Sequence, residues 1–181
     1  MNKNNFLKIK LDILSNNFVP NSFISKDKQT FYFKWIMRCD SKKLLEIRNS
    51  RYVRIMMNDT KPISIKEHNN FLLNYSDLPR IDFIICDKKY NQLIGSVNLN
   101  LTELGLEIGK YIGDKNFLGI GIAKQAMIQF LEYLQLYFPQ CSFFSKTKKE
   151  NIVNIALNEK LGFKFYKKIG KEYILMKMGK K

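Results

Sequence analysis

Hydrophobic and polar positions follow two different spacings along this chain, one typical of strands and one typical of helices. Aromatic and β-branched stretches predict strands at residues 31–38, 81–86, 93–99, 105–112, 141–145, 163–166 and 172–178. Apolar positions at helical spacing predict helices that begin near residues 41, 65, 120 and 151. Strands and helices mixed in this order predict an α/β fold with a mixed, mainly antiparallel sheet.

Several helix boundaries carry their own signals. Ser64 and Glu67 have the spacing of a capping box, in which each side chain binds the backbone N–H of the other residue. Pro139 bounds the longest helix, and Gly162 follows the last helix as a C-terminal cap. At its other end, the longest helix is expected to begin just after a glycine-containing turn at residues 113–121.

The chain divides into a polar N-terminal segment and one domain. Residues 1–30 are rich in Asn, Lys and Ser, and we expect an arm that packs loosely or adds an edge strand. The 181 residues are 45% hydrophobic, so residues 31–181 can bury a core of their own.

The charge balance is strongly basic and changes which partners are plausible. Lys and Arg number 31 against 16 Asp and Glu, a net charge of +15, which favours nucleic acid, phosphorylated metabolites or an acidic membrane face. No apolar run approaches the roughly 20 residues of a membrane span. Lysines interrupt the apolar residues near the start, so no signal-peptide core is seen and a cytoplasmic setting is expected.

Cysteine and histidine are too sparse for several kinds of site. Cys39, Cys86 and Cys141 are far apart and form no paired motif, which argues against a disulfide framework and a zinc ribbon. His68 is the single histidine, so a multi-histidine metal site is excluded. We expect no metal.

The segment with the clearest chemistry is the strand, glycine turn and helix over residues 105–138. Unpaired N–H groups at a helix N-terminus carry partial positive charge, and glycines let the backbone approach a phosphate. The candidate pyrophosphate cradle consists of Leu118, Gly119, Ile120, Gly121, Ile122 and Ala123. Neither a Walker loop nor the Rossmann glycine pattern matches, so a plain strand-to-helix turn stays open as an alternative.

A second candidate lies at the start of the following helix. The side chain of Asn151 either caps that helix or reaches a ligand between neighbouring strand ends, and capping alone remains open.

Together these two segments resemble the GNAT acetyltransferase superfamily. Residues 116–121 resemble its acetyl-CoA motif, Arg/Gln-x-x-Gly-x-Gly/Ala, with Asn116 in place of Arg or Gln. The Tyr111-Ile112-Gly113 strand end and the stretch from Asn151 to Phe163 are also similar to the family. The resemblance covers about residues 33–178.

The resemblance implies a GNAT fold with helices on both faces of the sheet and acetyl-CoA as the acetyl donor. The family's fourth and fifth strands splay apart around the pantetheine arm, which implies contacts at Ile112, Gly113 and Asn151. The pyrophosphate would lie on the amides of residues 118–122. A backbone N–H in a bulge of the fourth strand would polarise the acetyl carbonyl, and an amine would attack the thioester directly.

Proton transfer is less clearly marked in the sequence. Glu107, on the same strand, is the carboxylate we select as general base. Many members of the family use a tyrosine as general acid, and Asn158 stands at that position here. Tyr111 or a water molecule is left to supply the proton.

The N-terminal half resembles a narrower group, the nucleotide-amino-sugar N-acetyltransferases of pseudaminic acid biosynthesis. The similarity runs through residues 45–49, 53–57 and 63–71. It implies that Arg48 and His68 bind the nucleotide diphosphate and that Met57 lines the nucleotide site. The expected acceptor is then the amino group of a nucleotide-linked sugar, a small-molecule amine.

Other functions remain open at this point. A protein N-terminal acetyltransferase of the ribosomal-protein type would have a tunnel open at both faces, whereas a closed pocket around the three substrate residues would favour the sugar. A nucleic-acid-binding module fits the charge, but the lysines are dispersed and no RNA-binding aromatic motif is present. A non-catalytic GNAT scaffold and a homodimer are also left open.

Overall fold

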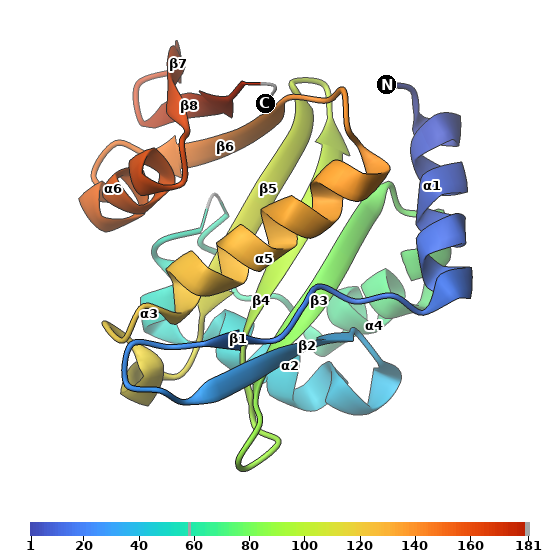
Figure 1. Ribbon diagram of the computed structural model, residues 1–181, viewed down its shortest axis with the longest axis vertical. Coiled ribbons are helices and arrows are strands. Elements are labelled where there is room, and N and C mark those ends of the chain that lie inside the picture. The colour runs from blue at the N-terminus through green and yellow to red at the C-terminus, as the bar shows by residue number, and fades with distance from the viewer. Residues whose placement is uncertain (58, 180–181) are drawn as a thin grey trace.

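The computed structural model describes residues 1–57 and 59–179, which form one mixed sheet with helices on both faces (Figure 1). The strands are β1 (Phe23–Ile24), β2 (Thr30–Trp35), β3 (Arg80–Asp87), β4 (Leu93–Thr102), β5 (Gly105–Ile112), β6 (Phe143–Lys148), β7 (Lys164–Ile169) and β8 (Tyr173–Met178). Their order across the sheet is β1-β2-β3-β4-β5-β6-β8-β7.

The α-helices are α1 (Lys3–Asn16), α2 (Ser41–Asn49), α3 (Arg51–Arg54), α4 (Ile65–Leu73), α5 (Ile122–Tyr137) and α6 (Ile152–Lys160). Short 3₁₀ turns are η1 (Arg38–Asp40), η2 (Tyr75–Asp77) and η3 (Lys115–Phe117). None of the helices formed by the described residues is long and apolar enough to cross a membrane.

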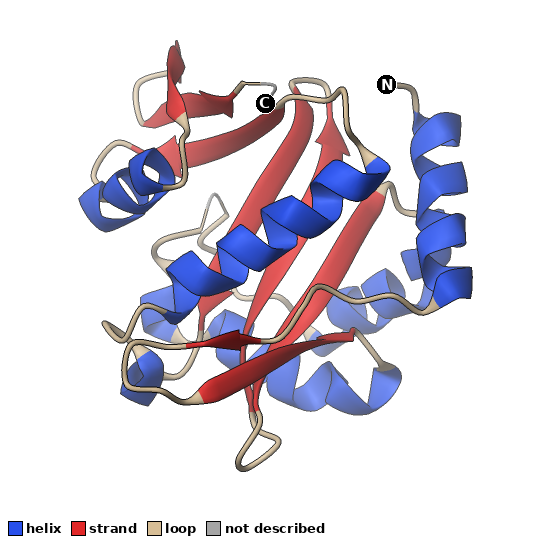
Figure 2. Cartoon of the chain, in the orientation of Figure 1, coloured by secondary structure: helices blue, strands red, loops and turns tan. Residues whose placement is uncertain are grey.

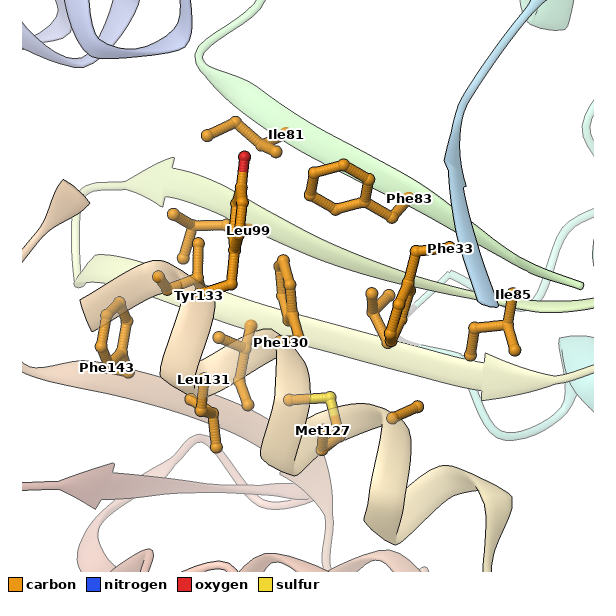
Figure 3. Packing of buried hydrophobic residues seen from close by; sticks show 14 of the residues in the cluster. Phe33, Ile81, Phe83, Ile85, Leu99, Met127, Phe130, Leu131, Tyr133 and Phe143 are labelled. Atoms are coloured by element: carbon orange, nitrogen blue, oxygen red, sulfur yellow. The ribbon is translucent and has the colours of Figure 1, made fainter. Parts of the chain in front are cut away.

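The helices form a layer on each side of the sheet, as Figure 2 shows. Helix α5 crosses one face, and the rings of its Phe130 and Tyr133 pack edge to face on Phe83 of β3 (Figure 3). On the opposite face, Leu44 of α2 packs in a smaller cluster with strand residues of β3 and β4. The predicted α/β fold with a mainly antiparallel sheet is confirmed.

The strands β5 and β6 separate soon after they meet. β5 pairs with β4 along its whole length, from Thr102 opposite Gly105 to Gly95 opposite Ile112. Its parallel pairing with β6 is limited to Leu106 with Phe143 and Glu107 with Phe144. Beyond these pairs the two strands diverge, and we call this gap the fork. The fork is the splay that the family resemblance implied.

One detail of the implied strand geometry is wrong. We expected a bulge in the fourth strand of the family's sheet, which corresponds to β5. The register of β5 against β4 runs without a shift over the whole ladder. The opening arises because β6 turns away from β5 toward β8, with which it pairs along its length.

The N-terminal segment adds the expected edge strand, but it does not pack loosely. Residues 3–16 form α1, whose Phe6 and Ile13 are fully buried in the main core, so the segment is not packed loosely. The ring of Phe6 stacks on Phe138 with centroids 5.6 Å apart. A two-residue edge strand, β1, pairs with β2.

Local signals at the helix ends are confirmed. Ser64 Oγ accepts from the N–H of Glu67 at 3.2 Å, and Glu67 Oε2 accepts from the N–H of Ser64 at 2.7 Å. Gly162 has φ of +90°, the left-handed conformation that glycine adopts readily after a helix. Helix α5 ends at Tyr137, just before Pro139.

Candidate active site

The turn that leads from β5 into α5 presents its backbone to the surface. Gly119 and Gly121 have φ of +80° and +85°, a region that side chains disfavour. A Cβ placed on Gly119 would meet no atom within 4 Å, so the space beside this backbone is open. The first amides of α5 have no partner within the helix, and the helix dipole adds positive potential there. The turn therefore fits a diphosphate.

Some backbone groups in the predicted cofactor contacts are already paired. The N–H of Leu118 donates to the Lys115 carbonyl at 3.2 Å, and the N–H of Gly113 donates to the Ile94 carbonyl at 2.6 Å. The Ile112 carbonyl accepts from the Tyr52 hydroxyl. Of the predicted cradle, the amides from Gly119 onward are thus the ones left to meet an anion.

Gly113 is required by packing. A Cβ at this position would lie 1.8 Å from the side chain of Ile47 on α2. The strand end can therefore approach α2 closely only with glycine here.

A cation near this turn was missed in the sequence. The backbone N–H of Lys26 donates to the Ile120 carbonyl at 3.0 Å, and its side chain lies against Gly121. Lys26 and Lys124 are both exposed at the start of α5. Lys26 belongs to the segment that we expected to be a loose arm, and only the fold brings it to the turn.

Asn151 acts as a helix cap. Its Oδ1 accepts from the backbone N–H of Asn154 at 3.1 Å and so satisfies one free donor of α6. The side-chain oxygen of Asn151 therefore serves the capping role that we left open.

A cavity of about 460 Å³ lies on the sheet face opposite α5. It is bordered by β3, β4 and β5 and by the helices α2 and α4. All five residues predicted for catalysis and substrate binding line this one cavity: Arg48, Met57, His68, Glu107 and Tyr111. The fold thus brings together residues that are widely separated in the sequence.

Two nitrogen atoms in this cavity have no partner. Arg48 Nη1 and His68 Nε2 are buried without a hydrogen bond to any described residue. Arg48 Nη2 donates weakly to the Asp59 carbonyl at 3.3 Å. Burial lowers the pKa of His68, against a hydrogen bond with the Ser41 backbone, so the imidazole is neutral at pH 7. Buried polar atoms are normally paired, so these two nitrogens indicate a ligand.

Glu107 lies at the last rung before the fork opens. Burial raises the pKa of its carboxyl group, and the positive charge of Lys146 partly opposes this. A carboxylate with a raised pKa is a better proton acceptor near neutral pH.

Tyr111 stays protonated near neutral pH. Burial is the main cause that raises the pKa of its phenol, and the charge of Asp82 adds to it. The phenol can therefore donate a hydrogen bond in the cavity.

The structure adds polar residues that the sequence analysis did not select. Arg80 and Asp82 on β3 form an ion pair, with Arg80 Nε donating to Asp82 Oδ2 at 2.7 Å. Asn98 and Asn100 on β4 also line the cavity. These residues are polar positions that alternate with apolar ones, and that alternation was the available signal.

Lys110 is a further residue that the sequence analysis did not select. Its Nζ donates to Oδ1 of Asn158 on α6 at 2.7 Å. Lys110 also lines the cavity. Among residues 1–57 and 59–179, no group of three metal-ligating side chains is placed to hold a metal ion.

A glycine turn that fits a diphosphate, a fork between strands and a cavity on the opposite face are the arrangement expected of an α/β group-transfer enzyme. A family model described as an acetyltransferase (GNAT) domain matches residues 32–164, and the chain belongs to this family. It is therefore an N-acetyltransferase that uses acetyl-CoA. No curated protein matches the chain significantly by sequence.

Solved structures show the same fold. A domain from Methanocaldococcus jannaschii is 23% identical, with a TM-score of 0.71 over 87% of this chain and 99% of that one. Spermidine N-acetyltransferase from Vibrio cholerae, in complex with CoA and spermine, is 18% identical, with a TM-score of 0.71 over 82% and 94%. A ribosomal L7/L12 alpha-N-protein acetyltransferase is 13% identical, with a TM-score of 0.69 over 83% and 94%.

The cradle can be tested with a charge reversal at its most open point. Gly119→Glu places a carboxylate beside the first amides of α5, and we expect acetyl-CoA affinity to fall about tenfold or more because like charges repel. Calorimetric titration with acetyl-CoA measures the change.

Gly170→Glu is the matched control for this test. Gly170, in the β7–β8 turn, also has positive φ and open space at its Cβ position, so the backbone strain is comparable. Equal affinities for the two variants would contradict the cradle.

Proposed function

We propose that this enzyme acetylates the amino group of a nucleotide-linked amino sugar. The observation that carries the proposal is the pair of unpartnered buried nitrogens, Arg48 Nη1 and His68 Nε2, in one cavity. A guanidinium offers a planar fork of donors that suits phosphate oxygens. The neutral imidazole of His68 can exchange a hydrogen bond with the same ligand.

The cavity has further properties that suit such an acceptor. Its volume of about 460 Å³ is within the range of small-molecule sites. Met57, Ile63 and Phe71 contribute apolar wall on the side of Arg48 and His68. A nucleotide diphosphate bound there would leave its sugar directed toward β5.

Glu107 and Tyr111 are the proposed catalytic residues of the cavity. Acetyl-CoA supplies the activated acetyl group. Glu107, at the mouth of the fork, removes a proton from the attacking amine. The phenol of Tyr111 donates a hydrogen bond to the acceptor on the same face. The cofactor contacts proposed are Gly119 to Ala123 through backbone amides, with Ile112, Gly113, Leu118 and Asn151 shaping the path.

A cationic acceptor is the second candidate. The carboxylates of Asp59 and Glu67 also line the cavity and would attract a polyamine or a peptide N-terminus. The similar structures include a spermidine N-acetyltransferase and a ribosomal-protein acetyltransferase. The net charge of +15 opposes this choice and favours an anionic acceptor.

The setting and assembly of the enzyme stay predictions from the sequence. We propose a cytoplasmic enzyme without a nucleic-acid partner, and a homodimer is the assembly that the sequence leaves open. A similar protein, the spermidine N-acetyltransferase from Vibrio cholerae, is dodecameric.

The acceptor is tested by measuring CoA thiol release with a panel of amines. We expect turnover with UDP- or dTDP-linked amino sugars, because their diphosphates satisfy Arg48. Spermidine and N-terminal peptides are the comparison acceptors. Turnover confined to the peptides or to spermidine would overturn the proposed acceptor.

Arg48 gives a more specific test. Arg48→Ala is expected to raise the KM for the sugar about ten- to a hundredfold, the effect of losing a charged hydrogen bond. The KM for acetyl-CoA should stay nearly unchanged, because Arg48 lies on the acceptor face. Arg51→Ala, at an exposed arginine of α3, is the control. Equal rises in both KM values would count against the assignment.

The base can be identified from the pH dependence. Activity requires the Glu107 carboxylate, so kcat/KM should rise with pH through its raised pKa. Glu107→Gln should remove this limb and lower kcat about a hundredfold or more. Lys146→Met removes the charge that lowers the pKa of Glu107, so the limb should move to higher pH. If the rising limb of the pH profile stays in place in Lys146→Met, the limb belongs to the acceptor amine instead.

A further inference from the structure

Lys110 on β5 reaches across the fork to Asn158 on α6. Its Nζ donates to Asn158 Oδ1 at 2.7 Å, and Asn158 is fully buried. The amide nitrogen of Asn158 donates to Ser145 Oγ at 3.0 Å and to Thr147 Oγ1 at 3.3 Å. These hydroxyls hold Asn158 so that its carbonyl oxygen faces Lys110. An ammonium has three donors, so Lys110 keeps donors for a second partner.

The electrostatics of Lys110 are unusual for a lysine that only stabilises a fold. Burial alone lowers its pKa to about 7. None of the titratable side chains on the neighbouring segments contributes to this value: Glu107, Tyr111, Lys146, Glu159 and Lys160. An apolar side chain would fill this place without the desolvation penalty of an amine. The bond to Asn158 uses one donor of the amine, so the cost of burying the amine is only partly offset within the fold.

The side chain of Lys110 points to the face from which a coenzyme would arrive. Ile108 and Ile112 belong to the cluster that packs with α5, and alternation along the strand puts Lys110 on the same side. Tyr111 packs against the cluster of α2 on the opposite face. Lys110 also borders the acceptor cavity, so it lies where the two faces meet at the fork.

The acetyl group must cross this place during the reaction. In the proposed function, the diphosphate of acetyl-CoA lies at the start of α5. The carbonyl carbon of the acetyl group must then reach an amine in the cavity on the other face. The thioester sulfur then remains on the α5 and α6 side of the fork. We propose that Lys110 is a catalytic residue that protonates this sulfur as the coenzyme leaves.

The proposed step balances as follows. The acceptor nitrogen forms a bond to the acetyl carbon, and the carbon–sulfur bond breaks with its electron pair going to sulfur. The ammonium of Lys110 gives one proton to that sulfur and becomes a neutral amine. Glu107 takes one proton from the acceptor nitrogen. Exchange with water afterwards returns a proton to Lys110 and removes one from Glu107.

This inference rests on the proposed function only through acetyl-CoA binding at the fork, so it is tested without an acceptor. The thiol pKa of bound coenzyme A is measured from the ultraviolet absorbance of the thiolate during a pH titration. The thiolate and the ammonium of Lys110 stabilise each other, so this pKa should lie about one unit or more below that of free coenzyme A titrated in parallel.

The variants separate a catalytic role from a structural one. Lys110→Met should return the bound thiol to at least its free value while coenzyme A affinity at low pH changes less than about threefold. Lys110→Gln, which keeps a hydrogen-bond donor for Asn158, should do the same and serves if the methionine variant does not fold. Lys164→Met, at an exposed lysine of β7, should leave the lowered pKa intact.

Several outcomes would overturn the inference. They are a bound thiol with an unshifted pKa in the unaltered enzyme, or a lowered pKa that survives both changes at Lys110. A shift lost only in Tyr111→Phe would assign the proton to the phenol. Failure of every amino sugar as acceptor would refute the proposed function but leave this measurement valid. Absence of coenzyme A binding would refute both.

Discussion

The early end of pairing between β5 and β6 is the constraint on which the candidate site depends. Each strand keeps its outer partner, β4 or β8, so the sheet holds while the inner edges face a gap. Unpaired strand edges within a fold normally invite another chain to pair with them. An extended ligand with amide groups can use these edges. The polar contact between Lys110 and Asn158 spans the gap in this structure.

The parts of the fold with strong local signals were predictable, and those that depend on distant contacts were not. The bounds of β5 and the capping box of α4 followed from residue type and spacing. Helix α1 was missed because Lys10 interrupts its apolar face, and its ammonium is satisfied by carbonyls far along the chain, Tyr75 and Leu78. Arg48, Met57 and His68 came from the family resemblance, whereas Glu107 and Tyr111 were chosen by residue type on the strand that the resemblance placed at the site. Arg80 and Asp82 alternate with apolar residues in the sequence, but only the fold shows that they line the cavity.

The proposed function gives the cavity two tasks that oppose each other electrostatically. Binding an anion requires unneutralised positive charge, whereas activating an amine requires a carboxylate. Arg80 and Asp82 neutralise each other within the cavity. In the proposed function, this leaves Arg48 on α2 for the anion and Glu107 on β5 for the proton. Because Arg48 and Glu107 lie on different elements, neither has to neutralise the charge of the other.

The loop between β1 and β2 shows that residues before the family match belong to the folded domain. The family match starts at residue 32, yet Lys26 supports the glycine turn from outside that match. Phe6 fills part of the same core as α5. The domain that folds as one unit therefore extends further toward the N-terminus than the family match does. Sequence change in the first thirty residues, which lie outside the family match, can alter coenzyme affinity through the Ile120 carbonyl that the N–H of Lys26 binds.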